Sequence, residues 1–286
     1  MLPVLPDIVS ERIKQRHASE YLYKIIPDSV ELINEKVFAV NFNTQYISTD
    51  SYDLWYDYLI IASGAYSVMP SGNDFNDPIY NIQNLENTLK LKKNLLKYLS
   101  ETKSPTIIIN GAGYTGIELA CHCQKVAFAQ NKNTQIILSD KSSTLLPFLK
   151  DKEKKHILHY LKSLNIEVMT GIELTKYTHK TVYFSNGLKY ENAFLCWSIG
   201  TKRLLNIDNN NFDTLKDGRI IVNKNLQIPN YKNVYVSGDA AAIYDHKNKQ
   251  YLRKAVNFAL YSGKHSAINI IRELQNKSLK PFIPRD

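Results

Sequence analysis

The chain has 286 residues, of which 44% are hydrophobic and 22% are charged, so we expect an ordered globular protein of one large or two ordinary domains. No stretch reaches the roughly 20 uninterrupted apolar residues that span a membrane, and the first residues lack the basic and apolar regions of a secretory signal. The net charge is +9, but the lysines are dispersed. This pattern indicates solvated faces, or long-range attraction to an anionic membrane surface, rather than nucleic-acid binding.

Apolar periodicity and turn residues predict the elements in chain order. We expect helices at 11–27, 84–100, 151–164 and 256–273, and strands at 30–40, 45–49, 56–62, 106–109, 135–138, 166–169, 172–177, 181–185, 188–190, 193–197, 219–222 and 233–237. Parallel-type strands with crossover helices, together with a short antiparallel insert, are typical of an α/β fold with more than one layer. The block at 84–202 would form one domain, and the flanks at 1–83 and 203–286 would pack together as a second.

The most informative segment of the chain runs from the expected strand at 106–109 into Gly111-Ala112-Gly113-Tyr114-Thr115-Gly116 and a helix. Strand, glycines and helix in this order are typical of a dinucleotide-binding βαβ unit. Gly111 would permit the tight turn, and Gly113 would let the backbone approach a pyrophosphate. Gly116 would allow the helix and the strand to pack closely. The pyrophosphate would then lie on the free N–H groups and positive dipole of the helix start.

Asp140 ends the next strand of the same unit. A carboxylate there can accept hydrogen bonds from an adenosine ribose and would repel the additional phosphate of NADP. The sequence therefore predicts NAD as the nucleotide.

Four segments in the same order resemble the two-dinucleotide-binding-domain flavoproteins of the pyridine nucleotide–disulfide oxidoreductase superfamily. They are 56–64, 111–118, Trp197-Ser198-Ile199-Gly200, and the 233–241 segment that ends in Gly238-Asp239-Ala240-Ala241. Within that superfamily the chain is most similar to type II NADH dehydrogenases. The resemblance implies a Rossmann-like fold in which an NAD domain is inserted into an FAD domain that is incomplete in this chain.

The resemblance also implies roles for individual residues. FAD would contact Ala62, Ser63, Gly64, Gly238 and Asp239, and NAD(H) would contact Gly111, Gly113, Gly116, Asp140 and Gly200. Glu118 matches the family's acid near the nicotinamide and quinone region, and Asn257 and Tyr261 occupy the positions of the family's paired glutamines near the quinone. The implied activity is transfer of hydride from NADH to FAD and then of electrons to a quinone.

The chain also departs from the family pattern. The family's first βαβ unit carries its own GxGxxG motif for the FAD pyrophosphate, and no glycine precedes Gly64 here. Two alternatives therefore stay open: another FAD-dependent NAD(P)H reductase with a ferredoxin, sulfide or small-thiol acceptor, or a non-catalytic NAD-binding remnant without FAD. We expect a cytoplasmic protein, which would bind peripherally to the cytoplasmic face of the inner membrane if it contacts lipid. A homodimer is compatible with the sequence.

The three cysteines, Cys121, Cys123 and Cys196, cannot build a disulfide framework, and a reducing cytosol is the simplest setting. Residues two apart on a helix point in nearly opposite directions, so Cys121 and Cys123 cannot bind one metal ion together. We expect packing cysteines and no metal site.

Overall fold

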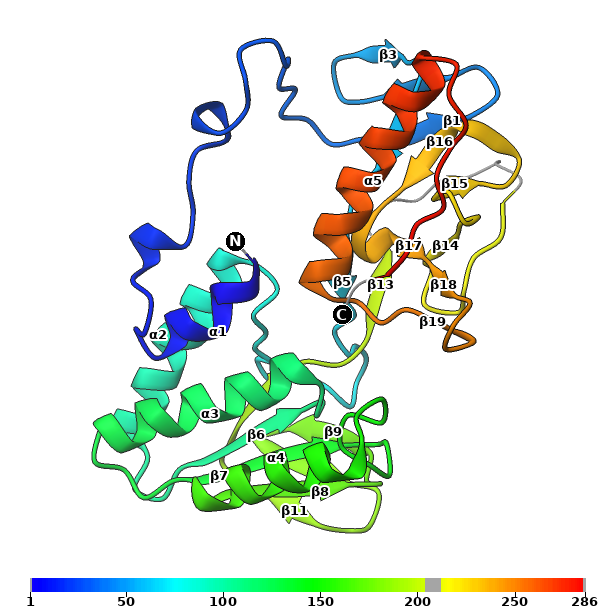
Figure 1. The fold of residues 1–286 in the computed structure, drawn as a ribbon. Helices are drawn as coiled ribbons and strands as arrows, with labels where there is room; N and C mark the ends of the chain where they lie inside the picture. Colours follow the sequence, from blue (N-terminus) through cyan, green and yellow to red (C-terminus); the bar gives the residue numbers. More distant parts are fainter. Residues whose placement is uncertain (1, 204–211, 285–286) are drawn as a thin grey trace. The chain divides into compact units, whose positions relative to one another are not determined.

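The computed structural model describes residues 2–203 and 212–284, and the chain divides into two compact units (Figure 1). The first unit comprises Met1–Ile26 and Ser67–Gly200, and the second comprises Pro27–Tyr66 and Thr201–Asp286. The first 26 residues thus group with the βαβ segment. The assignment of the three expected segments to FAD and NAD domains stays a prediction.

A four-stranded parallel sheet forms the centre of the first unit, in the order β12-β6-β7-β8. Its strands are β6 (Thr106–Asn110), β7 (Gln135–Asp140), β8 (Ile166–Thr170) and β12 (Ala193–Trp197), and its crossover helices are α3 (Tyr114–Ala129) and α4 (Asp151–Ser163). The strands read as nearly continuous apolar runs because helices and the antiparallel sheet cover the strand faces. This arrangement confirms the expected Rossmann-like α/β fold.

Other elements complete the first unit. Asn84 is the N-cap of helix α2 (Leu85–Glu101), and its side chain accepts a hydrogen bond from the Asn87 N–H at 2.8 Å. Helix α1 (Leu5–Val9) packs against α2 and α3. The strands β9 (Leu174–Thr178), β10 (Thr181–Phe184) and β11 (Lys189–Tyr190) form an antiparallel sheet. The expected turn at Asn186-Gly187 joins β10 to β11, with a φ of +86° at Gly187.

The second unit is built on strand β16 (Tyr231–Val236), which pairs in parallel with β4 (Leu59–Ile61) and antiparallel with β15 (Gln227–Ile228). Helix α5 (Val256–Leu274) packs against β16 and against the short 3-10 turn η4 (Gly238–Ala240). A meander of β1 (Ala39–Asn41), β2 (Tyr46–Ser48) and β3 (Asp53–Trp55) adds a second layer. Short pairs comprise β5 (Ala65–Ser67) with β13 (Thr201–Arg203), β14 (Ile220–Ile221) with β17 (Ala241–Ala242), and β18 (Tyr244–Asp245) with β19 (Gln250–Tyr251).

Two expectations near the N-terminus are wrong. The expected helix at 11–27 is replaced by two 3-10 turns, η2 (Gln15–His17) and η3 (Leu22–Lys24). Tyr21, Leu22, Tyr23 and Ile25 are all exposed, so the segment has no buried apolar stripe to stabilise a helix. Of the expected strand at 30–40, only Ala39 and Val40 belong to a strand, β1.

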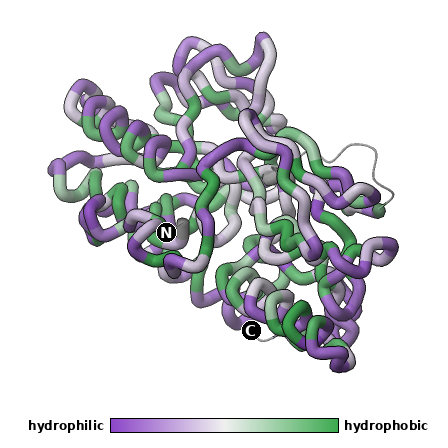
Figure 2. Tube along the Cα trace, turned by 90° about the horizontal axis from the view of Figure 1, so that it is seen from above, coloured by the Kyte–Doolittle hydropathy of each residue, from purple (hydrophilic) through white to green (hydrophobic). Residues whose placement is uncertain are grey.

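Hydrophilic and hydrophobic stretches alternate along the chain (Figure 2). Among the helices within residues 2–203 and 212–284, none is both long and apolar enough to cross a bilayer.

Candidate functional site

Gly111 begins the loop between β6 and α3 and has a φ of +116°. A Cβ atom at this position would lie 2.6 Å from Ser198 Oγ and 2.9 Å from the Ser198 carbonyl carbon. Ser198 is held there because its N–H donates to the Asn110 oxygen at 2.8 Å and its hydroxyl donates to the Gly111 oxygen at 2.9 Å. Both the backbone conformation and the contact with Ser198 therefore require glycine.

Gly116 is closely surrounded by other atoms, whereas Gly113 is not. A Cβ atom on Gly116 would lie 1.8 Å from the Gly111 oxygen, so this glycine allows α3 to pack on the loop. A Cβ atom on Gly113 would meet nothing within 4 Å, and Gly113 is exposed. Gly113 is also the N-cap of α3, and no side chain caps the helix there. The first N–H groups of α3 are thus open to an anion, which fits a nucleotide pyrophosphate.

Asp140, at the end of β7, is tied directly to the glycine loop. Its Oδ2 accepts the Ala112 N–H at 2.7 Å, and its Oδ1 accepts the Ser142 N–H at 2.7 Å. A carboxylate has further lone pairs, so Asp140 can still accept from a ribose hydroxyl. The sequence indicated the ribose contact and missed this second role, in which the acid fixes the loop.

The register of the parallel sheet gathers these residues at one edge. Asn110 pairs with Ser139 on one side and with Trp197 on the other. Gly111, Asp140 and the segment after Trp197 therefore follow neighbouring strand ends, where ligands of open α/β sheets bind.

Gly200 lies on the continuation of β12, with a φ of +72°. Its carbonyl oxygen accepts the Val68 N–H at 2.7 Å, and the Trp197 indole N–H donates to the Val68 oxygen at 3.0 Å. Val68 thus fixes the backbone at Gly200. Sequence reasoning missed this residue, because its contribution comes from its backbone and leaves no signal in residue type.

Glu118 lies in the second turn of α3 and is exposed. Desolvation raises the pKa of Glu118, and the Asp7 carboxylate of α1 raises it further. Asp7 itself lies 3.3 Å from Arg12 Nη1 and 3.5 Å from His122 Nε2. The structure therefore places Glu118 in a charged cluster that joins α1 to α3, and its role near the nicotinamide stays a prediction.

A second candidate site lies at the ends of two parallel strands of the second unit. Ile61 of β4 pairs with Val236 of β16, so the Ala62–Gly64 segment and the Ser237–Asp239 segment leave the sheet side by side. Gly64 and Gly238 have φ values of +70° and +65°.

A cavity that can hold a ligand lies at this edge of the sheet. The Ser63 hydroxyl is buried and has no hydrogen-bond partner among the described residues, and Ala62 and Ser63 line a mainly apolar cavity of about 400 Å³. A buried hydroxyl without a protein partner can hydrogen-bond to a polar ligand, and the arrangement fits a flavin cofactor.

Two serines of α5 support the turn after β16. The Ser262 hydroxyl accepts the Gly238 N–H at 2.9 Å, and the Ser266 hydroxyl lies 2.9 Å from the Ser237 hydroxyl. Both α5 serines are fully buried. Sequence reasoning missed them, although two serines four residues apart in an apolar helix mark one polar stripe.

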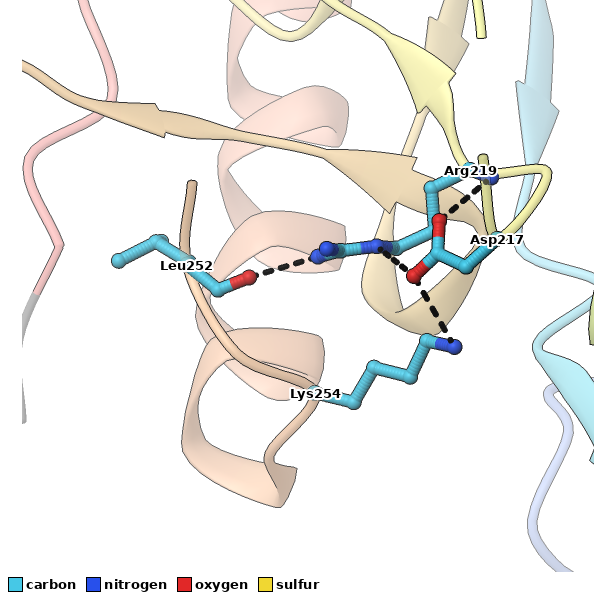
Figure 3. Close-up of polar contacts among 4 residues, drawn as sticks. All are labelled: Asp217, Arg219, Leu252 and Lys254. Atoms are coloured by element: carbon cyan, nitrogen blue, oxygen red, sulfur yellow. Dashed lines mark hydrogen bonds and ion pairs between the residues drawn. The ribbon is translucent and has the colours of Figure 1, made fainter. Parts of the chain in front are cut away.

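Asp239 is half-buried and takes no hydrogen bond or ion pair from the described residues. Burial raises the pKa of its carboxyl group, and the Lys254 and Arg219 cations oppose that shift. Both cations are engaged by Asp217, whose Oδ2 lies 2.8 Å from Arg219 Nε and 3.5 Å from Lys254 Nζ (Figure 3). The Asp239 carboxylate is therefore available as an acceptor, as the flavin assignment requires.

The raised pKa predicts that Asp239→Asn stabilises the protein at neutral pH. A carboxyl group whose pKa is raised on folding contributes stability below its unfolded pKa, and this is lost as the pH rises through its folded pKa. At pH 7 the asparagine variant avoids the cost of a half-buried charge, and we expect its Tm to rise by about 2 °C. Thermal melts of both proteins from pH 4 to pH 8 measure the difference, which should vanish at the acid end.

Asp245→Asn is the matched control. Hydrogen bonds from Asn248 and from the Lys247 N–H lower the pKa of Asp245, so its charged form stabilises the fold and its replacement should lower the Tm at pH 7. If both variants shift the Tm in the same direction, the account of Asp239 is wrong.

The two residues expected near a quinone lie one turn apart on α5 but in different surroundings. Tyr261 lines a cavity of about 360 Å³, together with Lys264, His265, Ile268 and residues 280–283. Asn257 is not among the residues that line this cavity. The structure thus places Tyr261, and not Asn257, at this cavity, and the quinone site stays a prediction.

The glycine loop and the two strand-end edges define a protein of the dinucleotide-binding α/β class. Residues 3–261 match the pyridine nucleotide-disulphide oxidoreductase family, and the chain belongs to that family. This result confirms the resemblance found in the sequence. Membership of the family implies FAD and NAD(H) as the cofactors, as the sequence predicted.

Relatives include the type II NADH:quinone oxidoreductases of Staphylococcus saprophyticus and Staphylococcus haemolyticus, which are 23% and 24% identical over 274 residues. Each alignment covers 89% of this chain and 68% of the relative.

Solved structures with a similar fold include the water-forming NADH oxidase from Lactobacillus brevis, with a TM-score of 0.76 at 18% identity. They also include the sulfide:quinone oxidoreductase from Aquifex aeolicus, with a TM-score of 0.77 at 19% identity. The chain spans 62% of the length of the first protein and 68% of the second, and these alignments cover 99% and 96% of this chain.

Proposed function

We propose that the chain acts as a flavin-dependent NADH dehydrogenase that passes electrons to a quinone. The observation that carries this proposal is the junction of β6 and α3, where an uncapped helix start and an open Gly113 adjoin the Asp140 carboxylate. That junction offers an anion site and a ribose acceptor at one sheet edge. The names of the staphylococcal relatives support the quinone as acceptor.

The residues of this chain would bind and orient the two coenzymes. The first turn of α3 would hold the NADH pyrophosphate, Asp140 would accept from the ribose, and the Gly200 backbone would lie near the nicotinamide. In the second unit, Asp239 would accept from the ribityl chain, and Ser63 and Gly64 would contact the flavin. Bound FAD supplies the redox chemistry, so no side-chain nucleophile is required.

We place the protein in the cytoplasm, with peripheral contact at the inner membrane. Its net charge of +9 supports attraction to anionic lipid through long-range potential.

Another acceptor is the first alternative. The similar folds include a sulfide:quinone oxidoreductase and the putidaredoxin reductase–putidaredoxin complex, so the fold accommodates different electron acceptors. A non-catalytic NAD-binding protein is the second alternative.

A visible absorption spectrum of the purified chain tests the proposal. Flavin bands that bleach when NADH is added, and recover when a soluble short-chain quinone is added, support NADH:quinone activity. Bands that bleach with NADH but recover only with a ferredoxin or a sulfur compound would favour the first alternative. A colourless protein that still binds NADH after incubation with FAD would favour the second.

A further inference from the structure

The adenosine end of the glycine-loop site carries an ion pair. Lys141 follows Asp140 directly, and its Nζ lies 3.0 Å from each carboxylate oxygen of Glu173. Glu173 belongs to the turn between β8 and β9, a different element from the one that carries Lys141. Lys141, the cation that follows Asp140 in the sequence, is thus held by the Glu173 carboxylate of a different turn.

Backbone hydrogen bonds fix both members of the pair. The Gly171 N–H donates to the Ser142 oxygen at 2.8 Å, and the Ile172 N–H donates to the Asp140 oxygen at 3.2 Å, so the two segments are joined. The Glu173 N–H donates to the Ser185 hydroxyl at 3.2 Å, and the Ser185 N–H donates to the Glu173 oxygen at 2.8 Å. The pair is therefore positioned by the fold, although both side chains are exposed.

The surroundings of the pair contain donors that suit a phosphate. Residues 141–144 are Lys-Ser-Ser-Thr, and all four are exposed. In dinucleotide-binding folds the extra phosphate of NADP lies near the acid that ends the second strand, and a nearby cation accommodates it. Lys141 directly follows that acid in this chain, so Asp140 would oppose a phosphate there, and Glu173 pairs with the cation that would bind it.

We propose that Glu173 is a specificity-determining residue, which favours NADH over NADPH by holding Lys141 in an ion pair. This inference rests on the proposed function, because it requires that the glycine loop bind the coenzyme. In the parent protein the Glu173 carboxylate competes with a doubly charged 2′-phosphate for Lys141. An exposed ion pair contributes about 0–1 kcal/mol, so removing the Glu173 charge should strengthen NADPH binding by up to about that amount.

The test compares the affinities of NADH and NADPH for the full chain by isothermal titration calorimetry. Glu173→Gln should tighten NADPH binding by about fivefold, which is a change of about 1 kcal/mol, and change NADH binding by less than about twofold. Lys141→Ala should weaken NADPH binding alone. In the double variant the gain from Glu173→Gln should disappear.

Glu191→Gln is the matched control. Glu191 is an exposed acid of the same unit that pairs with Lys189 at 2.8 Å, so its replacement changes the net charge equally without touching the site. An equal gain in NADPH affinity in this control, a gain that persists in the double variant, or no gain in Glu173→Gln would overturn the inference. A parent chain that binds neither coenzyme would instead refute the proposed function.

Discussion

Gly113→Val should weaken NADH binding by at least about 100-fold while the fold persists. A Cβ atom at this position meets nothing within 4 Å, so the fold has room for a larger residue there. The backbone there has φ −75° and ψ 179°, a conformation that valine adopts readily. The side chain would instead fill the space through which a pyrophosphate reaches the first N–H groups of α3.

Calorimetric titration with NADH measures the loss of affinity, and a thermal melt checks that the fold persists. The Tm should stay within about 2 °C of the parent, since surface substitutions that meet no neighbour cost little. Gly113→Ala provides an intermediate step, with a loss of affinity of about tenfold from its smaller side chain. Undiminished NADH affinity in the valine variant would show that the coenzyme binds elsewhere.

Gly116→Ala should lower the stability of the first unit, whereas Gly113→Val should leave it nearly unchanged. Its Cβ would lie 1.8 Å from the Gly111 oxygen and 2.7 Å from the Ser198 hydroxyl. The Gly111 carbonyl belongs to backbone, so it cannot rotate away as a flexible side chain could. We expect a loss of about 3 kcal/mol in the free energy of unfolding, which corresponds to a fall in Tm of about 6–12 °C.

Chemical denaturation followed by circular dichroism measures this loss, and Gly263→Ala is its control. Gly263 also lies inside a helix, but a Cβ atom there meets nothing within 4 Å. That variant should be as stable as the parent or more stable, because alanine favours helix by about 1 kcal/mol over glycine. Equal stability of the two variants would mean that α3 does not pack on the loop as described.

Much of the first site could be predicted from the sequence because its requirements are local. The strand at 106–109, the three glycines and the following helix are adjacent in the chain, so their order alone marks the loop. The apolar runs of β7, β8 and β12 were likewise predicted close to their observed bounds. By contrast, the expected helix at 11–27 is wrong, because burial against other elements decides helix formation there and none of its large apolar residues is buried.

The sequence by itself determined that this chain folds as a nucleotide-binding α/β protein, and it identified the glycine loop and the acid that ends β7. Only the tertiary structure decided what holds these residues in place. The Ala112 N–H on Asp140, the Ser198 side chain against Gly111 and Glu173 on Lys141 each join segments that are distant in sequence. Strand register and packing create such contacts, so no local pattern of residue types records them.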